Sequence, residues 1–385
     1  MALVRTPLQA RDLSSKALER MSDKLAAGME MGGFTSCDAA MSELDRSVPW
    51  GCNDFLGAPP GGGGEDRTGP VATRPMSGAA PLFRSEMPAE GLGLGLGAFH
   101  GSLGTVGGGN HFAELQVPHR VYDEALQLKC GLDADQAVLL VHSGSRGLGQ
   151  AVLERHEALF GDTGLEVGSA EADTYLALHD GACEWARHNR RLIARRFLRC
   201  LGCEQEPHCV LDVWHNHVAP ECCRCKPSAG EPWESLAQGA DAERESESER
   251  ETEELLWLHR KGAAPSTEGP VVIPGSRGTL SYLVLPVSPR IGLAFSLAHG
   301  AGRKWSREMA HRATKVRYPD ADALRRTNLG GRVVCSDKAL LYEEAPEAYK
   351  CVDAVVKDLV DQGFITVIAS FRPLLTFKTA AQQAG

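Results

Sequence analysis

Four short segments of the chain place a histidine beside glycine, asparagine or serine. Their sequences are GGGNHFAE, HSGSRG, HNHVAPE and HGAGR, at residues 107–114, 142–147, 215–221 and 299–303. Neutral imidazole is a good ligand for Mn, Zn or Fe, and glycine lets backbone amides come close to a phosphate. A single histidine is more often an ordinary surface or core residue, but four such segments are harder to explain in that way. The pattern therefore indicates metal-assisted phosphoryl chemistry.

Short apolar runs adjoin these histidines. His142, His215 and His299 each follow such a run, whereas His111 comes just before one. The runs are AVLLV at 137–141, VLDVW at 210–214, GLAFSLA at 292–298 and FAELQV after His111, and a further run, GPVVIPG at 269–275, leads into Ser276. Runs of this length bounded by glycine or proline predict buried strands. We therefore expect a rigid sheet whose strand ends carry the site.

Helical periodicity is clearest in two segments, residues 173–199 and 347–361. Residues 1–50 begin with a strand-like stretch and continue as a helix with Leu18, Met21 and Leu25 on one face. The helix at 173–199 has an arginine-rich face, made of Arg187, Arg190, Arg191, Arg195, Arg196 and Arg199. Two interpretations of this face stay open: contacts with RNA phosphates, or an ordinary solvated surface.

Charge and composition narrow the class of protein. The 385 residues carry a net charge of -9, but residues 241–254 contain eight acids and two arginines and so supply most of it. Such a run predicts a solvated, disordered insertion, and the remainder is near neutral. Twelve cysteines in a chain of this length indicate reduced thiols or metal ligands. No stretch has the roughly 20 apolar residues of a membrane span and none resembles a signal peptide, so we expect a cytoplasmic protein without a membrane partner, with nuclear and organellar locations left open.

The residues of these motifs resemble those of the RtcB family of RNA-splicing ligases. The matching segments, in family order, are GTVGGGNHFAE, HSGSRGLG, HNHVAPE, HRKGA (259–263), PGSRGTLSY (274–282), HGAGRKWSR (299–307) and RPLLTFK (372–378). They cover most of the chain from about residue 98 to 380, and together they are very specific. The resemblance implies an α/β (α+β-like) fold with mixed β-sheets and surrounding helices in a single large domain. Residues 1–97 would be its N-terminal part with Gly/Pro-rich loops, and 98–385 the catalytic core, with a disordered acidic insertion at about 227–255.

The resemblance also implies roles for individual residues. His111, His142 and His215 match metal ligands of the family, which uses two Mn²⁺ ions, and His299 matches the nucleophile that takes GMP from GTP. Glu114 matches the carboxylate that reads guanine, a base that offers it both N1–H and an amino group. The implied nucleotide-binding set is Asn110, His111, Phe112, Ala113, Glu114, His215, Asn216, Pro274, Gly275, Ser276, Arg277, Ser281, His299, Gly300, Ala301, Gly302 and Lys378.

RNA is the substrate that the family resemblance implies. The guanylate on His299 would pass to an RNA 3′-phosphate, formed by opening a 2′,3′-cyclic phosphate, and a 5′-hydroxyl end would then attack. Both tRNA splicing and RNA repair fit this chemistry, and the need for an activating protein is left open. The basic residues expected to contact RNA, beside the arginine-rich helix, are Arg146, Lys261, Arg303 and Lys304.

One family motif has no counterpart in this sequence. Relatives carry an Asp-x-x-Cys-Gly motif near the N-terminus, whose cysteine contacts both manganese ions, and MALVRTPL at residues 1–8 resembles the segment directly after that motif. Met1 is then an internal methionine of a longer protein, or the chain is a metal-deficient form. In either case we expect the chain as given to hold Mn²⁺ poorly.

Two other functions compete with the ligase. Cys200-x2-Cys203 and Cys222-x2-Cys225 have the spacing of a zinc ribbon, which would make the protein a non-catalytic nucleic-acid-binding module; ordinary thiols are the simpler alternative. A manganese-dependent phosphoesterase would keep the metal site but have no use for a guanine pocket at Glu114, Ser281 and Lys378. GTP binding no tighter than ATP binding would favour that hydrolase.

Overall fold

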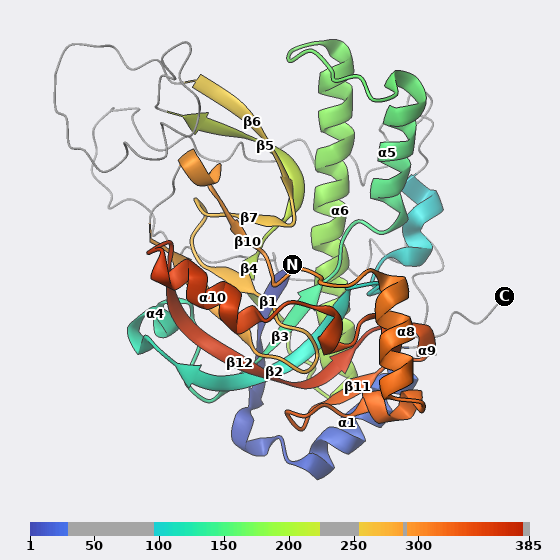
Figure 1. Cartoon of the computed structure of the whole chain (residues 1–385), viewed down its shortest axis with the longest axis vertical. Coiled ribbons are helices and arrows are strands. Elements are labelled where there is room, and N and C mark those ends of the chain that lie inside the picture. The colour runs from blue at the N-terminus through green and yellow to red at the C-terminus, as the bar shows by residue number, and fades with distance from the viewer. Residues whose placement is uncertain (30–95, 224–253, 288–290, 380–385) are drawn as a thin grey trace.

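An eight-stranded sheet forms the centre of the computed structural model, which describes residues 1–29, 96–223, 254–287 and 291–379. The strand order is β4-β1-β3-β2-β12-β9-β8, and β11 pairs with β12 outside this path (Figure 1). The bounds are β1 Ala2–Gln9, β2 Phe112–Val121, β3 Gln136–His142, β4 His208–Asp212, β8 Val271–Ile273, β9 Ser281–Pro286, β11 Arg332–Val334 and β12 Ile365–Phe377. All pairs are antiparallel except β11 with β12.

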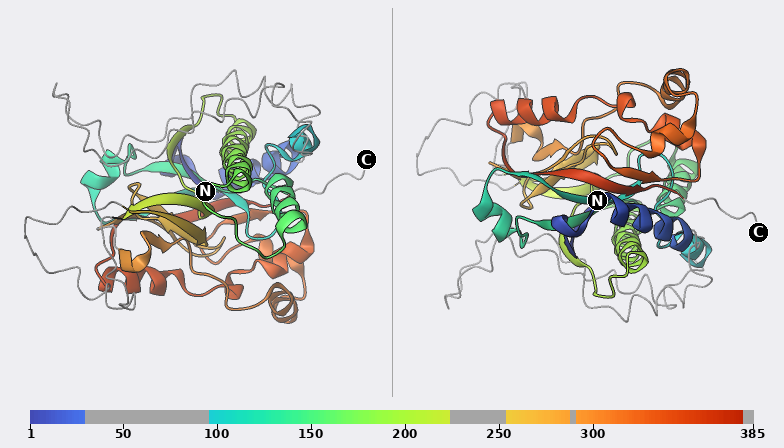
Figure 2. Two further views of the ribbon diagram at one scale, coloured as in Figure 1. Left: turned by 90° about the horizontal axis from the view of Figure 1, so that it is seen from above. Right: turned by 90° about the horizontal axis from the view of Figure 1, so that it is seen from below.

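Both faces of this sheet are buried, because successive side chains of each strand point to opposite sides. Val4 and Leu139 belong to one apolar cluster, which includes residues of helices α1 (Ser15–Gly28) and α6 (Ala170–Cys200). Leu3 and Leu140 belong to a second cluster, which includes residues of α10 (Val352–Asp361). The sheet therefore lies between two layers of helices, as the end-on views show (Figure 2).

Smaller elements extend from this core. Helix α5 (Gly147–Phe160) runs beside α6, and the two project from the body as an arm (Figure 1). Strands β5 (Asn216–Cys223) and β6 (Glu254–Lys261) form a two-stranded sheet, and β7 (Ala263–Pro265) pairs with β10 (Ser296–Ala298). The remaining α-helices of the described part are α4 (Glu124–Lys129), α8 (Arg307–Arg317) and α9 (Lys338–Glu343).

The expected mixed α/β fold is confirmed, and the strand expected at residues 137–141 corresponds to β3. The helix expected at 347–361 is wrong in its first turn. Residues 346–348 form a 3-10 turn, and Tyr349 is extended because its backbone bridges to Arg303, so α10 begins only at Val352. The run at 292–298 is a strand only from Ser296 onward.

The arginine-rich face of α6 is an internal surface over much of its length, so both sequence interpretations are wrong for Arg190, Arg191 and Arg195. These three residues are buried. Arg190 pairs with Asp212 at 2.6 Å, and Arg195 pairs with Glu206 at 2.8 Å. The segment that leads into β4 and the end of that strand supply these carboxylates. Arg199, in the last turn of α6, is exposed.

Two predicted loop segments lie largely outside the described residues. Most of the Gly/Pro-rich part of residues 1–97 is among them, as is nearly all of the acidic insertion expected at about 227–255. The insertion boundary needs a small correction, because β6 begins at Glu254 and pairs there with Cys223. Among the helices that the structure describes, none combines the length and the hydropathy needed to cross a membrane.

Candidate active site

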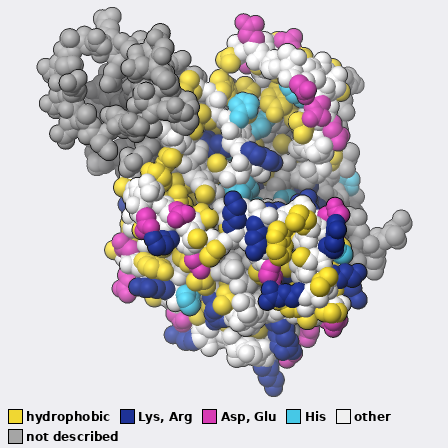
Figure 3. Space-filling view, viewed as in Figure 1, with side chains coloured by type: hydrophobic (Ala, Val, Ile, Leu, Met, Phe, Trp, Pro, Cys, Tyr) yellow, Lys and Arg dark blue, Asp and Glu magenta, His cyan; other side chains and the backbone are white. Residues whose placement is uncertain are grey.

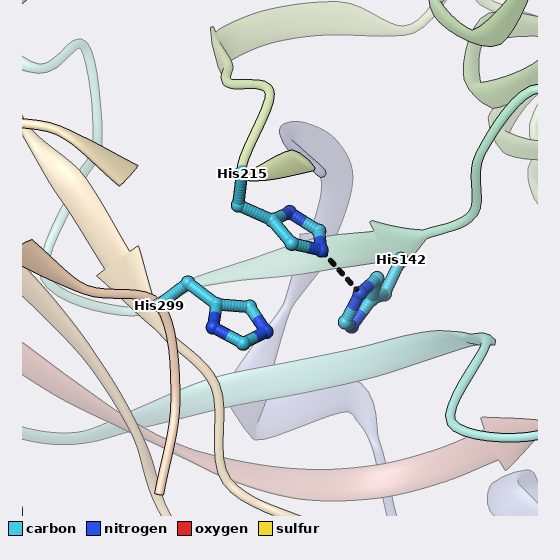
Figure 4. A group of neighbouring side chains, drawn as sticks. All are labelled: His142, His215 and His299. Carbon is cyan, nitrogen blue, oxygen red and sulfur yellow. Dashed lines mark hydrogen bonds between the residues drawn. The ribbon is translucent and has the colours of Figure 1, made fainter. Parts of the chain in front are cut away.

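Four histidines from separate parts of the chain meet at one end of the central sheet. His142 ends β3, His215 follows β4, and His299 follows β10 (Figure 4). The Nε2 atoms of His142 and His215 are 3.3 Å apart, and the rings of His215 and His299 are stacked with centroids 4.3 Å apart. One nitrogen from each of these three rings can be chosen so that all lie within 4.8 Å of one another. The ring of His111 lies 5.9 Å from that of His142.

Strand pairing explains why distant histidines become neighbours. Strand β1 pairs with both β3 and β4, so His142 and the segment after β4 emerge at the same end. Phe112 is the register partner of His142, which places His111 at that end too. The Met1 amine is buried there and donates to the Val213 carbonyl at 2.7 Å.

Helix α6 holds the loop that follows His142. The Asn189 amide donates to Ser143 Oγ at 3.1 Å and to the Gly144 carbonyl at 3.2 Å. Arg190, which is paired with Asp212, donates to the Ser143 carbonyl at 3.1 Å. A buried amide and guanidinium therefore fix the loop backbone from behind.

The tautomer of His299 follows from one hydrogen bond. Its Nδ1 lies 2.7 Å from the carbonyl oxygen of Gly262, and because a carbonyl only accepts, Nδ1 carries the proton. In the neutral ring Nε2 is then unprotonated. Gly262 has φ +69, and an added Cβ would lie 3.2 Å from the His299 ring. The side-chain oxygen of Asn216 accepts from the Gly262 amide at 2.8 Å and so anchors this turn.

The four rings are neutral near pH 7. Burial is the main cause that lowers their pKa values, to about 4 for His111 and about 2 for His215, and in the same direction for His142 and His299. Nδ1 of His215 is buried with no hydrogen-bond partner among the described residues. Neutral imidazoles facing one another present lone pairs to a common point, which suits a divalent cation of the Mn or Zn type. The tightest group contains His299 in place of the predicted ligand His111.

Glu114 lies at the centre of a buried polar cluster beneath the loops. Gln116 donates from Nε2 to Glu114 Oε1 at 2.6 Å and to Ser281 Oγ at 2.9 Å. Thr376, its register partner on β12, donates to the other carboxylate oxygen. Burial raises the pKa of Glu114 to about 7 and lowers the pKa of Lys378 to about 8.

Gln116 and Thr376 are residues of this cluster that the sequence prediction missed. Gln116 is two residues beyond Glu114 on the same strand, so the period-two alternation of β2 could have indicated it. Thr376 could be found only from the register between β2 and β12, which the sequence does not provide.

The two glycine-containing loops of the predicted nucleotide site lie side by side. A Cβ on Gly300 would be 3.7 Å from the Pro274 carbonyl, and Gly275 has no room for one, since it would lie 2.1 Å from the Leu280 carbonyl. The Gly275 amide donates to Ser281 Oγ at 3.1 Å. The Ser276 amide donates to Thr279.

The other predicted nucleotide residues differ in accessibility. Asn110 and Gly302 are exposed, and Ala301 is half-buried. Phe112 and Ala113 pack in the two apolar clusters of the sheet. Arg277 is buried and donates to the Leu341 carbonyl at 2.6 Å, so its guanidinium is directed into the protein.

The basic residues near the histidines also differ. Arg146 has φ +58, a left-handed conformation that costs energy for any residue with a Cβ, and its guanidinium lies where a Cβ of Gly107 would be. Arg303 is paired with Glu344 at 3.0 Å. Lys261 and Lys304 are exposed. Arg146 and the two lysines are therefore more available for phosphate than Arg303.

The cysteine pair at the end of α6 lies in apolar surroundings. Cys203 belongs to the cluster that contains α1 and α6, Cys200 packs against that cluster, and burial raises the pKa of both thiols. Protonated thiols in such a place are the ordinary alternative to a zinc ribbon. Cys225 and the side chain of Cys222 lie outside the described residues.

Comparison with known proteins gives the class to which this fold and site belong. Residues 1–379 match the family model described as tRNA-splicing ligase RtcB. The chain is 45% identical over 284 residues to RNA-splicing ligase RtcB2 of Escherichia coli, a match that covers 74% of the chain and 66% of the relative. It is 32% identical over 315 residues to tRNA-splicing ligase RtcB of Nanoarchaeum equitans, covering 72% and 59%. With RNA-splicing ligase RtcB of Mycobacterium tuberculosis the identity is 31% over 306 residues, covering 71% and 64%.

The chain therefore belongs to the RtcB family. It spans slightly less than two thirds of the length of these relatives, from 59% to 66%.

Proposed function

We propose that this protein is a GTP- and Mn²⁺-dependent RNA ligase that joins 2′,3′-cyclic phosphate or 3′-phosphate ends to 5′-hydroxyl ends. The observation that carries the proposal is the set of four neutral histidines, one of which, His299, has its Nδ1 proton committed to the Gly262 carbonyl. A side chain that attacks phosphorus needs an available lone pair, and Nε2 of His299 provides one.

The proposed first step uses this lone pair. His299 Nε2 attacks the α-phosphorus of GTP, a nitrogen–phosphorus bond forms, and the bond to the departing pyrophosphate breaks. GMP then passes to an oxygen of an RNA 3′-phosphate, which releases His299. The 5′-hydroxyl of the second RNA end attacks the activated phosphate, loses its proton, and displaces GMP. Water opens a 2′,3′-cyclic phosphate beforehand.

Manganese fits the same cluster. His142 and His215 would hold it, with His111 as a further ligand, because their neutral rings offer lone pairs at neutral pH and the Nε2 atoms of His142 and His215 face each other 3.3 Å apart. Such an ion supplies Lewis-acid neutralisation of phosphate charge. The chain's own residues orient the nucleophile: Asn216 anchors Gly262, and Gly262 fixes the His299 ring.

The buried Glu114 cluster favours a ligase over the manganese phosphoesterase. A carboxylate can accept from both N1–H and the amino group of guanine, and adenine offers no such pair. Burial raises the pKa of the Glu114 carboxyl to about 7, and burying such a group costs folding stability. A protein without a ligand to bind at this position would not need a carboxylate there. We infer that Glu114, with Ser281 and Lys378 nearby, selects GTP.

The decisive experiment is labelling with GTP carrying a radioactive α-phosphate, in the presence of Mn²⁺. Because we expect the chain to hold Mn²⁺ poorly, the wild-type chain should acquire an acid-labile label, as expected for a phosphoramidate, at high Mn²⁺ concentration, and His299→Ala should lose it entirely. His119→Ala is the matched control because His119 is exposed on β2. Label that persists in His299→Ala, or absence of label on the wild-type chain at every Mn²⁺ concentration, would overturn the proposal.

A further inference from the structure

The arm formed by α5 and α6 carries an apolar groove that the proposed chemistry does not use. A cavity of 220 Å³ lies between the two helices, and its apolar walls come from Val152, Leu159, Phe160 and Leu178. The rings of His156 and Tyr175, which also line it, are 4.9 Å apart. The arm projects away from the central sheet, at whose strand ends the histidines lie (Figure 1).

Apolar surface is exposed on and around this groove. Leu159 lines it and is 61% exposed, and Val167, in the connection between the helices, is 71% exposed. Leu153 on α5 is 43% exposed. Scattered apolar residues on a surface need no explanation, but exposed apolar side chains that line a cavity, as Leu159 does, are typical of a binding surface.

The charge around the groove indicates the kind of partner that would bind. Residues 147–180 contain seven carboxylates and one basic residue of the Lys and Arg type, Arg155. Arg155 and one of the carboxylates, Glu171, line the groove itself. The segment that forms the groove is therefore strongly acidic. Glu157, Glu166 and Glu171 are exposed. Asp and Glu side chains gather beside hydrophobic ones over the outer end of the arm (Figure 3).

We propose that this groove is a docking site for a basic amphipathic helix of a partner protein. Apolar side chains at helical spacing would fill the groove between α5 and α6, and flanking lysines or arginines would pair with the carboxylates around it. The same carboxylates repel RNA phosphates, anionic lipid headgroups and the arm of a second copy. The site is distinct from the histidine cluster and does not depend on the proposed reaction.

The test uses the full chain and a fluorescent peptide of leucine and lysine at helical spacing, about five turns long. We expect the wild-type chain to raise its fluorescence anisotropy, and binding to weaken on the order of tenfold in Leu159→Ser. Leu128→Ser is the matched control and should bind as the wild type does, because Leu128 is 62% exposed and α4 lies on the opposite side of the molecule from the arm (Figures 1 and 2). Glu157→Gln with Glu166→Gln should weaken binding and reduce its dependence on salt.

Several results would overturn the proposal. Equal binding by Leu159→Ser and Leu128→Ser would mean that the peptide does not use the groove. Equal affinity for a peptide of the same composition in scrambled order would show that charge alone attracts it. Self-association of the wild-type chain that Leu159→Ser abolishes, measured by sedimentation, would assign the groove to a second copy.

Discussion

At the scale of single residues, the site depends on protons held in defined places. The carbonyl of Gly262 keeps a proton on Nδ1 of His299, and this leaves an available lone pair on Nε2. Both carboxylate oxygens of Glu114 accept a hydrogen bond, one from Gln116 and one from Thr376, yet burial still keeps its pKa near 7. In the proposed reaction, Glu114 selects the nucleotide and His299 supplies the nucleophile, so different residues carry the two functions.

The raised pKa of Glu114 predicts a pH-dependent preference for GTP. Below pH 7 the carboxyl is protonated and cannot accept two hydrogen bonds from guanine, so GTP affinity should fall about tenfold per pH unit. Above pH 8 the carboxylate of Glu114 is ionised and adds no further change, whereas Lys378, whose pKa is about 8, loses its charge in that range. The measurement is the ratio of ATP to GTP dissociation constants between pH 5.5 and 8.5, by titration calorimetry.

Glu114→Ala serves as the control for this titration. In this variant the ratio of the ATP to the GTP dissociation constant should be close to 1 and should not change with pH, because no carboxylate remains to be titrated. A wild-type preference for GTP that does not change with pH would mean that Glu114 does not read the base.

At the scale of elements, α6 is the part of the protein that connects the core to the site. Its buried Asn189 and Arg190 hold the backbone after His142, and Arg190 also neutralises Asp212 at the end of β4. Two strand ends that carry site residues are thus joined through one helix. The arginine-rich face of α6 lies against strand ends and so has a structural role, which the helical periodicity of the sequence alone does not reveal.

Removal of the Arg190 guanidinium should destabilise the protein strongly. Arg190→Met would leave the fully buried Asp212 without its closest cation, and we expect a loss of about 3 kcal/mol in the free energy of unfolding. Arg20→Met on α1 is the control; since Arg20 is exposed, the change should be within about 0.5 kcal/mol. Urea unfolding followed by circular dichroism measures both, and similar losses in the two variants would contradict the assignment.

At the scale of the whole molecule, the site is assembled from segments that span nearly 200 residues, from His111 to His299. The central sheet brings them together, and the β5–β6 hairpin contributes Asn216 at its base. The acidic run lies between the two strands of this hairpin in sequence. Cys223 and Glu254 are register partners, so the two ends of that segment are adjacent.

This adjacency predicts that residues 224–253 can be replaced by a two-residue Asn-Gly turn. A turn of that kind joins paired antiparallel strands directly, so the fold should be retained. We expect the midpoint of thermal unfolding to change by no more than about 3 °C and GMP labelling to persist. A drop of more than about 10 °C would show that the segment contributes to the stability of the folded chain.

The sequence alone indicated the family of this protein and, through the family, the chemistry that we propose. The seven motifs and their order predicted the family, and the apolar runs predicted strands such as β3, because both are local properties of a few adjacent residues. Strand β1 and helix α1 also follow from local periodicity. Family membership is confirmed by the match over residues 1–379.

Only the tertiary structure decided which residues share an environment. The burial of Arg190, the roles of Gln116 and Thr376, and the Nδ1 proton of His299 depend on partners far away in sequence. Hydrogen bonding, burial and pKa are set by neighbours in space, and strand order and register, which fix those neighbours, result from packing of the whole sheet. Local sequence therefore gives the kind of reactive group, and the fold gives its state.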